Sequence, residues 1–197
     1  MPWLVLLYPV FAHLGVWLHN LYLQWLALVS LLIVMLSKAL IRRRVWAWIT
    51  LVSSAAAAYF LTLRGGGIYA LYVPPIAIPL GLLWIFARSL GQGMTPLVSR
   101  IAELVRGEPL PDVLRVYTRR VTQLWCVVAS GLLISAISTA IWASPQMWSL
   151  ITNVIHYVVI GATFIIELAY RRIKYAKLQP YGLTQYLRRL ARVRITF

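Results

Sequence analysis

Four polar side chains recur at helical spacing within one apolar stretch: Asn153, His156, Thr163 and Glu167. Residues three and four apart share one face of a helix, and a polar face of a membrane helix is expected to point into the protein. We take His156 and Glu167 as candidate acid/base residues, and Asn153 and His156 as candidates for binding a ligand inside the membrane. The alternatives are structural: Asn153 and His156 would bond neighbouring helices, and Glu167 would pair with Arg171 four residues later.

A second set of candidates is a group of arginines between residues 94 and 120, the one sizeable polar segment between apolar stretches. A guanidinium group can hold a phosphate or a carboxylate by two hydrogen bonds. These side chains could therefore bind a lipid head group, the phosphopantetheine of an acyl carrier protein or an acidic partner surface. Anchoring to anionic lipid is an equal alternative. The candidates are Arg100, Arg106, Arg115, Arg119 and Arg120.

The sequence gives little support to metal or nucleophile chemistry. His13 could meet His156, but two histidines and one glutamate are too few ligands for a metal site, so we predict neither a metal nor a cofactor. Cys126 is the only cysteine, which leaves no intrachain disulfide. Because a thiolate is costly in apolar surroundings, a structural cysteine is the favoured interpretation.

The composition indicates a membrane protein. Hydrophobic residues make up 61% of the chain and charged residues 12%, about half of the roughly 25% charged residues of a soluble domain. The net charge of +15 could indicate nucleic acid, but the basic residues cluster at the ends of apolar stretches. That distribution follows the positive-inside rule and favours anionic membrane lipids as partners, so we expect no nucleic-acid partner.

The elements that must position these side chains are apolar stretches close to the ~20 residues that span a bilayer. We therefore predict an all-α, polytopic membrane protein with six transmembrane helices. The basic loops place both termini in the cytoplasm. The membrane domain covers residues 1–177, and a basic amphipathic tail covers residues 178–197. The six helices are expected at about 3–18, 21–40, 45–63, 68–90, 121–143 and 148–170.

The fourth of these helices contains three prolines, Pro74, Pro75 and Pro79. Each removes a backbone donor, so together they should kink or break the helix. In lipid, the freed carbonyl groups must be satisfied by neighbouring helices or by water in a cavity. Pro74 and Pro75 are therefore candidates for lining a ligand cavity, and a kink that only shapes helix packing is the alternative.

The polar segment at 94–120 should lie at the membrane interface. Its residues 97–106 form an amphipathic pattern that Gly107 should stop, with Ser99, Arg100, Glu103 and Arg106 on the polar face. We expect this helix to lie with its apolar face on the membrane. Asp112 should then open a second helix, which continues into the membrane with Arg115, Arg119 and Arg120.

Two segments resemble a known family: TPLVSRIAELVRGEPLPDVLRVYTRRVTQLW and WSLITNVIHYVVIGATFIIELAYRRIKY. They are similar to small bacterial inner-membrane proteins found with the machinery for aryl-polyene and xanthomonadin-type lipids. Some family members are labelled ketosynthases, but one cysteine at a membrane edge does not supply the catalytic set of a condensing enzyme. The resemblance covers roughly residues 68–175, and its motif residues include Tyr72, Pro74, Pro75, Thr95, Pro96, Arg100, Arg106, Gly107, Tyr117, Arg119, Trp125, Trp148, Asn153, Glu167, Tyr170 and Arg171.

The resemblance implies a protein of a bacterial inner membrane and names no reaction. The function that we expect is an accessory or non-catalytic one. The protein would bind a lipid-like polyene intermediate, or the enzymes or acyl carrier protein that handle it, and help assembly or transfer at the cytoplasmic face. One alternative is a membrane-embedded acyl or glycosyl transferase that uses His156 and Glu167. Another is a small lipid transporter or flippase whose path follows the proline-containing fourth helix.

Overall fold

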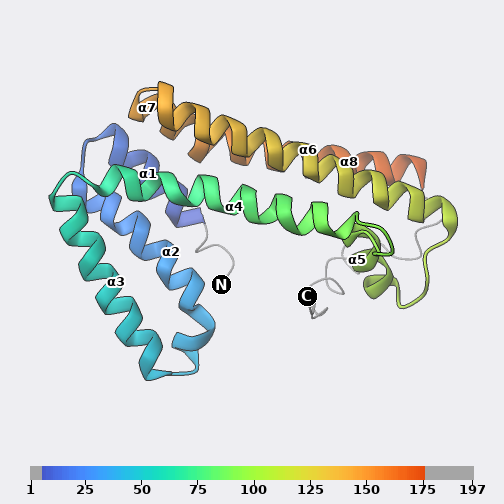
Figure 1. The fold of residues 1–197 in the computed structure, drawn as a ribbon, viewed down its shortest axis with the longest axis horizontal. Coiled ribbons are helices and arrows are strands. Elements are labelled where there is room, and N and C mark those ends of the chain that lie inside the picture. Colours follow the sequence, from blue (N-terminus) through green and yellow to red (C-terminus); the bar gives the residue numbers. More distant parts are fainter. Residues whose placement is uncertain (1–5, 176–197) are drawn as a thin grey trace. The chain divides into compact units, whose positions relative to one another are not determined.

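The computed structural model describes residues 6–175, and the elements found there are helices (Figure 1). The predicted tail at 178–197 and the beginning of the predicted first helix lie outside the described residues. The helices are α1 (Leu7–Trp17), α2 (Leu21–Ile41), α3 (Val45–Leu63), α4 (Gly67–Ser89), α5 (Leu97–Arg106), α6 (Asp112–Trp142), α7 (Pro145–Leu150), a π-helix (Ile151–Ile155) and α8 (His156–Lys174).

The chain divides into two compact units. The first comprises Met1–Ile78 and Leu132–Val158, and the second comprises Pro79–Gly131 and Val159–Phe197. Helices α4 and α6 each contribute to both units, and the continuous helical stretch from α7 to α8 does the same. Each unit is described below by its own contacts.

Five helical stretches of the described chain are long and apolar enough to cross a membrane: α2, α3, α4, α6 and Pro145–Lys174. Between 11% and 22% of the residues in their apolar windows are buried inside the protein, so most of the apolar surface faces outward, as in a multi-pass membrane protein. Helix α1 has 11 residues. At about 1.5 Å per residue it is shorter than the roughly 30 Å of a bilayer core, so the structure supports five spans and leaves the predicted sixth open.

In the first unit, α1 and α2 form a close antiparallel pair (Figure 1). The Asn20 side chain accepts hydrogen bonds from the backbone N–H groups of Tyr22 and Leu23, at 3.0 and 3.2 Å, and so caps α2. Gly15 lies at a close approach of the two helices, because a Cβ atom there would be 2.7 Å from the backbone nitrogen of Gln24. The Gln24 side chain in turn donates to the Gly15 carbonyl oxygen at 3.3 Å.

Helix α4 runs from Gly67 to Ser89 without interruption, so its prolines do not break it. Pro75 has no N–H group, and the carbonyl four residues before it, that of Leu71, therefore loses its usual helical donor. The Tyr8 hydroxyl of α1 donates to this carbonyl oxygen at 3.0 Å, and both residues are buried. Of the two predicted alternatives, a neighbouring helix or water in a cavity, the structure shows the neighbouring helix at the Leu71 carbonyl.

The core of the first unit gathers around Trp148 of α7, which is fully buried. Its ring lies 4.5 Å from that of Tyr72, between centroids, in an edge-on arrangement. Tyr8, Ala12 and Leu71 belong to the same buried cluster. The tryptophan thus joins α1, α4 and α7 within one apolar cluster.

In the second unit, α5 ends at Gly107 in the left-handed conformation, with φ of 79°, as predicted. Ser99 of α5 is fully buried, and its hydroxyl lies 2.6 Å from that of Thr118 in α6. The backbone N–H of Val98 donates to the Thr122 hydroxyl at 3.3 Å. The assignment of Ser99 to the polar face was therefore wrong, because the serine is buried and supplies one of the hydrogen bonds that join α5 to α6.

Helix α6 begins at Asp112, as predicted, and continues to Trp142 over 31 residues. The arginines of the polar segment and the apolar residues after it therefore belong to one continuous helix. Phe86 of α4 stacks on Trp125 of α6 with a centroid distance of 6.2 Å, and Trp125 contacts Phe164 of α8 at 4.5 Å. These rings hold α4, α6 and α8 together within the second unit.

Candidate functional site

The predicted polar stripe is divided between the two units. Asn153 and His156 belong to the first unit, and Thr163 and Glu167 belong to the second. A π-helix occupies Ile151–Ile155, and its wider turn shifts the faces that α-helical spacing would align. The four side chains therefore do not form a single site by virtue of their spacing alone.

Asn153 and His156 each bond a neighbouring group in the first unit. His156 Nε2 lies 2.7 Å from the Ser135 hydroxyl of α6. The Asn153 amide donates to the Ser149 hydroxyl at 3.2 Å, and Ser149 lies 3.1 Å from His13 Nδ1 of α1. His13 thus contacts Ser149, while His156 is bonded elsewhere. Among residues 6–175, no group of three histidine, cysteine or acidic side chains could hold a metal ion.

Two polar atoms of this region are buried and have no hydrogen-bond partner within the described chain: Trp148 Nε1 and Asn153 Oδ1. The first belongs to a fully buried side chain and the second to one that is 7% exposed. Pro74 and Pro75 are also buried in this unit. Neither proline lines the pocket that lies in the second unit.

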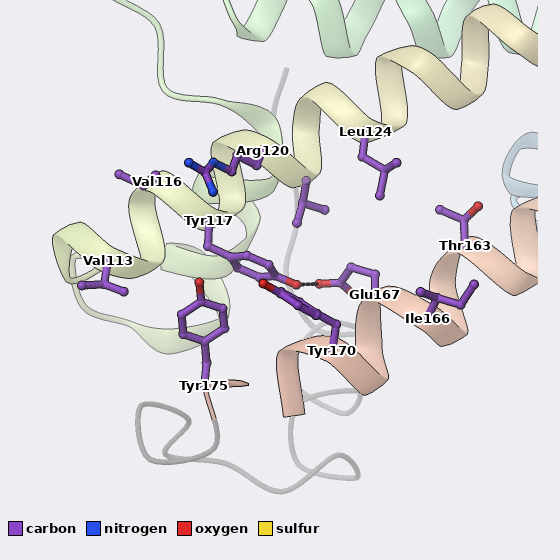
Figure 2. Close-up of a pocket in the computed structure, with 11 residues that line it drawn as sticks. Val113, Val116, Tyr117, Arg120, Leu124, Thr163, Ile166, Glu167, Tyr170 and Tyr175 are labelled. Carbon is purple, nitrogen blue, oxygen red and sulfur yellow. Dashed lines mark hydrogen bonds between the residues drawn. The ribbon is translucent and has the colours of Figure 1, made fainter. Parts of the chain in front are cut away.

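The second unit contains a pocket of about 610 Å³ between α6 and α8 (Figure 2). Its surface is mostly apolar, with wall residues from both helices such as Leu124 and Ile166. Its polar side chains include Tyr117, Arg120 and Glu167. The full lining comprises Val113, Val116, Tyr117, Arg120, Val121, Leu124, Thr163, Ile166, Glu167, Tyr170 and Tyr175.

Glu167 is held by two partners at one end of its carboxylate. The Tyr117 hydroxyl donates to Glu167 Oε1 at 2.9 Å (Figure 2), and Arg171 Nε lies 3.5 Å from the same oxygen. The side chains of Glu167 and Arg171 are 14% and 19% exposed. The structural alternative for Glu167, a pair with Arg171, is confirmed, and the arginine balances the charge of the carboxylate.

Three tyrosines form a cluster beside this pair. The ring centroid of Tyr117 lies 4.7 Å from that of Tyr175 and 6.0 Å from that of Tyr170. Lys174 donates to the Tyr170 hydroxyl at 2.8 Å, and its ammonium nitrogen lies 5.2 and 5.9 Å from the ring centroids of Tyr170 and Tyr175. Sequence reasoning did not select these tyrosines as site residues, although Tyr117 precedes Arg120 by three residues and Tyr170 follows Glu167 by three.

The five candidate arginines do not converge on one site. Arg120 lines the pocket. Arg115 pairs with Asp112 at 3.8 Å, and Arg106 with Glu108 at 3.7 Å. Arg119 is exposed on α6, and Arg100 is exposed on α5. Arg120 is therefore the predicted arginine that the structure places at a cavity.

Compared with known proteins, the chain matches no protein-family model, no curated protein and no solved structure. The predicted membership of the aryl-polyene-associated family therefore stays a prediction. What the described chain offers is a multi-pass helical fold with an apolar pocket whose polar side chains include an arginine, a glutamate and three tyrosines.

Proposed function

We propose that this protein is an accessory membrane protein that binds a lipid-like molecule in the pocket between α6 and α8. The pocket is the observation that carries the proposal. Its volume of about 610 Å³ falls within the range of small-molecule sites, which combine apolar walls with a few polar groups. An amphiphilic ligand would place its chain against Leu124 and Ile166 and its polar end toward Arg120.

The position of the pocket relative to the bilayer, as expected from the length of α6, supports this assignment. At about 1.5 Å per residue, the 31 residues of α6 exceed the length needed to cross a bilayer core of roughly 30 Å. Its charged residues, from Asp112 to Arg120, all lie in the first third of the helix. The excess length therefore belongs at the N-terminal end, where the pocket begins, so a ligand there would extend from the head-group layer into the apolar layer.

The proposed setting is the inner membrane of a bacterium, with six spans and cytoplasmic termini. The basic residues support a cytoplasmic location of the pocket, because they gather after α2, around α5 and at the end of α8. The sequence resemblance supports a polyene-type lipid as the ligand. In this setting the protein would help the assembly or transfer of a polyene intermediate, together with the enzymes or the acyl carrier protein that handle it.

Lipids that co-purify with the protein in mild detergent test the proposal. We expect mass spectrometry to find one enriched amphiphile with the wild-type protein. The double variant Leu124→Trp/Ile166→Trp narrows the pocket from both helices and should retain at least about fivefold less of it, a loss of about 1 kcal/mol in binding.

The matched control is Val127→Trp/Ile165→Trp, which places the same side chains at two exposed positions outside the pocket lining. This variant should retain the amphiphile at the wild-type level. Bulk phospholipid in equal proportion in all three preparations would refute binding in the pocket.

A further inference from the structure

Given a lipid-like ligand in this pocket, we infer that the polar end of that ligand is an anion, a carboxylate or a phosphate, bound by Arg120 and Lys174. This inference rests on the proposed function and narrows the ligand to one chemical class. It follows from the charges around the pocket, from the fixed position of the lysine and from the hydroxyl groups beside it.

Two cations belong to this pocket. Arg120 is one of its lining residues. Lys174 donates a hydrogen bond to Tyr170 and lies near the rings of Tyr170 and Tyr175, both of which line the pocket. Two positive charges at one apolar cavity attract an anion from outside the chain.

The chain itself has no side-chain carboxylate left for this pair, because it contains four acidic residues and the structure engages each of them elsewhere. Glu108 pairs with Arg106, Asp112 with Arg115, and Glu167 with Arg171. Glu103 accepts a hydrogen bond from the backbone N–H of Leu110 at 3.4 Å. The side-chain carboxylates of the chain therefore leave Arg120 and Lys174 to an anionic ligand.

The donors around the pair suit an oxyanion. A guanidinium group can offer two parallel N–H donors to a carboxylate or a phosphate, and a lysine adds a compact charge. The Tyr170 hydroxyl accepts from Lys174, so its own hydrogen remains available for donation. Figure 2 shows Arg120, Tyr117 and Tyr175 toward one end of the pocket, with Leu124 and Ile166 toward the other. The anionic group would bind at the first end, and the apolar chain would extend to the second.

Binding of a conjugated tetraene fatty acid, cis-parinaric acid, tests this inference on the full-length protein in neutral detergent. The measurement is made at about pH 8.5, which is well above the usual pKa of a carboxyl group, so the acid carries a negative charge. The acid should bind at least about tenfold more tightly than its methyl ester, which keeps the chain and removes the charge. Arg120→Gln should reduce the affinity for the acid, and Arg120→Gln/Lys174→Gln should reduce it to that for the ester. Neither variant should change the affinity for the ester.

Arg119→Gln is the matched control, because Arg119 is the preceding residue of α6, is exposed and does not line the pocket. It should preserve the preference for the acid over the ester. Displacement of the bound acid by dodecyl phosphate or by dodecanoate then tells whether the site takes phosphate or carboxylate more tightly, and displacement by either agrees with an anion site.

Three outcomes separate the inference from the proposed function. Equal affinity for acid and ester in the wild-type protein would refute the anion site and leave chain binding intact. Equal losses of affinity for the acid in Arg119→Gln and Arg120→Gln would assign the preference for the acid to general surface charge, and this would also refute the anion site. Unchanged binding of both ligands in Leu124→Trp/Ile166→Trp would overturn the pocket itself and the proposed function with it.

Discussion

Replacing Gly15 by alanine is expected to lower the free energy of unfolding by about 2 to 3 kcal/mol, the upper part of the range for overpacking a tight contact. The added methyl group would lie 2.7 Å from the backbone nitrogen of Gln24 and 3.1 Å from the carbonyl carbon of Leu23. Backbone atoms cannot turn aside as the end of a side chain can, so α1 and α2 must move apart. Unfolding of the purified protein by increasing sodium dodecyl sulfate in mixed micelles measures the loss.

Gly81→Ala in α4 is the control for this substitution. A Cβ atom at Gly81 would meet nothing within 4 Å, and alanine favours a helix over glycine by roughly 0.5 to 1 kcal/mol. This variant should therefore be as stable as the wild-type protein or slightly more stable. A Gly15→Ala protein that unfolds at the same detergent fraction as Gly81→Ala would show that α1 and α2 are not in such close contact.

Replacing Tyr8 by phenylalanine is expected to cost about 1 to 3 kcal/mol, because the carbonyl of Leu71 would then be buried without a donor. The hydroxyl is the one group that Tyr8 loses, and the ring can keep its place in the apolar cluster. Sodium dodecyl sulfate unfolding, as for Gly15→Ala, gives the change in stability.

Pro75→Ala provides a sharper test of the same hydrogen bond. Alanine restores the N–H group that α4 lacks at this position, and that group is the natural helical donor to the Leu71 carbonyl. In a Pro75→Ala background, Tyr8→Phe should therefore cost at least about 1 kcal/mol less than it does alone. If the two substitutions are simply additive, the tyrosine does not compensate for the proline.

Much of the fold was predictable because it follows from the spacing of apolar residues and from the residues that begin and end helices. The end of α5 at Gly107 and the start of α6 at Asp112 agree with the structure, because a left-handed glycine and an acidic first turn act locally. The burial of Ser99 was not predictable in this way. Its partner Thr118 lies 19 residues away, and only the packing of α5 on α6 brings the two hydroxyl groups together.

The candidate site was predicted in part for a similar reason. The pair of Glu167 and Arg171 lies within one helical turn, so its spacing was sufficient. The pocket depends on which faces of α6 and α8 meet, and the helical spacing of the polar stripe could not show that. The π-helix at Ile151–Ile155 also changes the faces within the stripe, and nothing in the apolar pattern around Asn153 indicated it.

Helix α1 leaves the ribosome before the helices whose polar groups it contacts. The Tyr8 hydroxyl is made 63 residues before the Leu71 carbonyl, and His13 is made 136 residues before Ser149. At roughly 5 to 20 residues per second, His13 therefore waits on the order of ten seconds for its partner. The carbonyl freed by Pro75, in contrast, meets a Tyr8 hydroxyl that is already made when α4 is synthesised. The order of synthesis thus leaves His13 of α1 without its partner for a time, whereas the Leu71 carbonyl of α4 has its donor from the start.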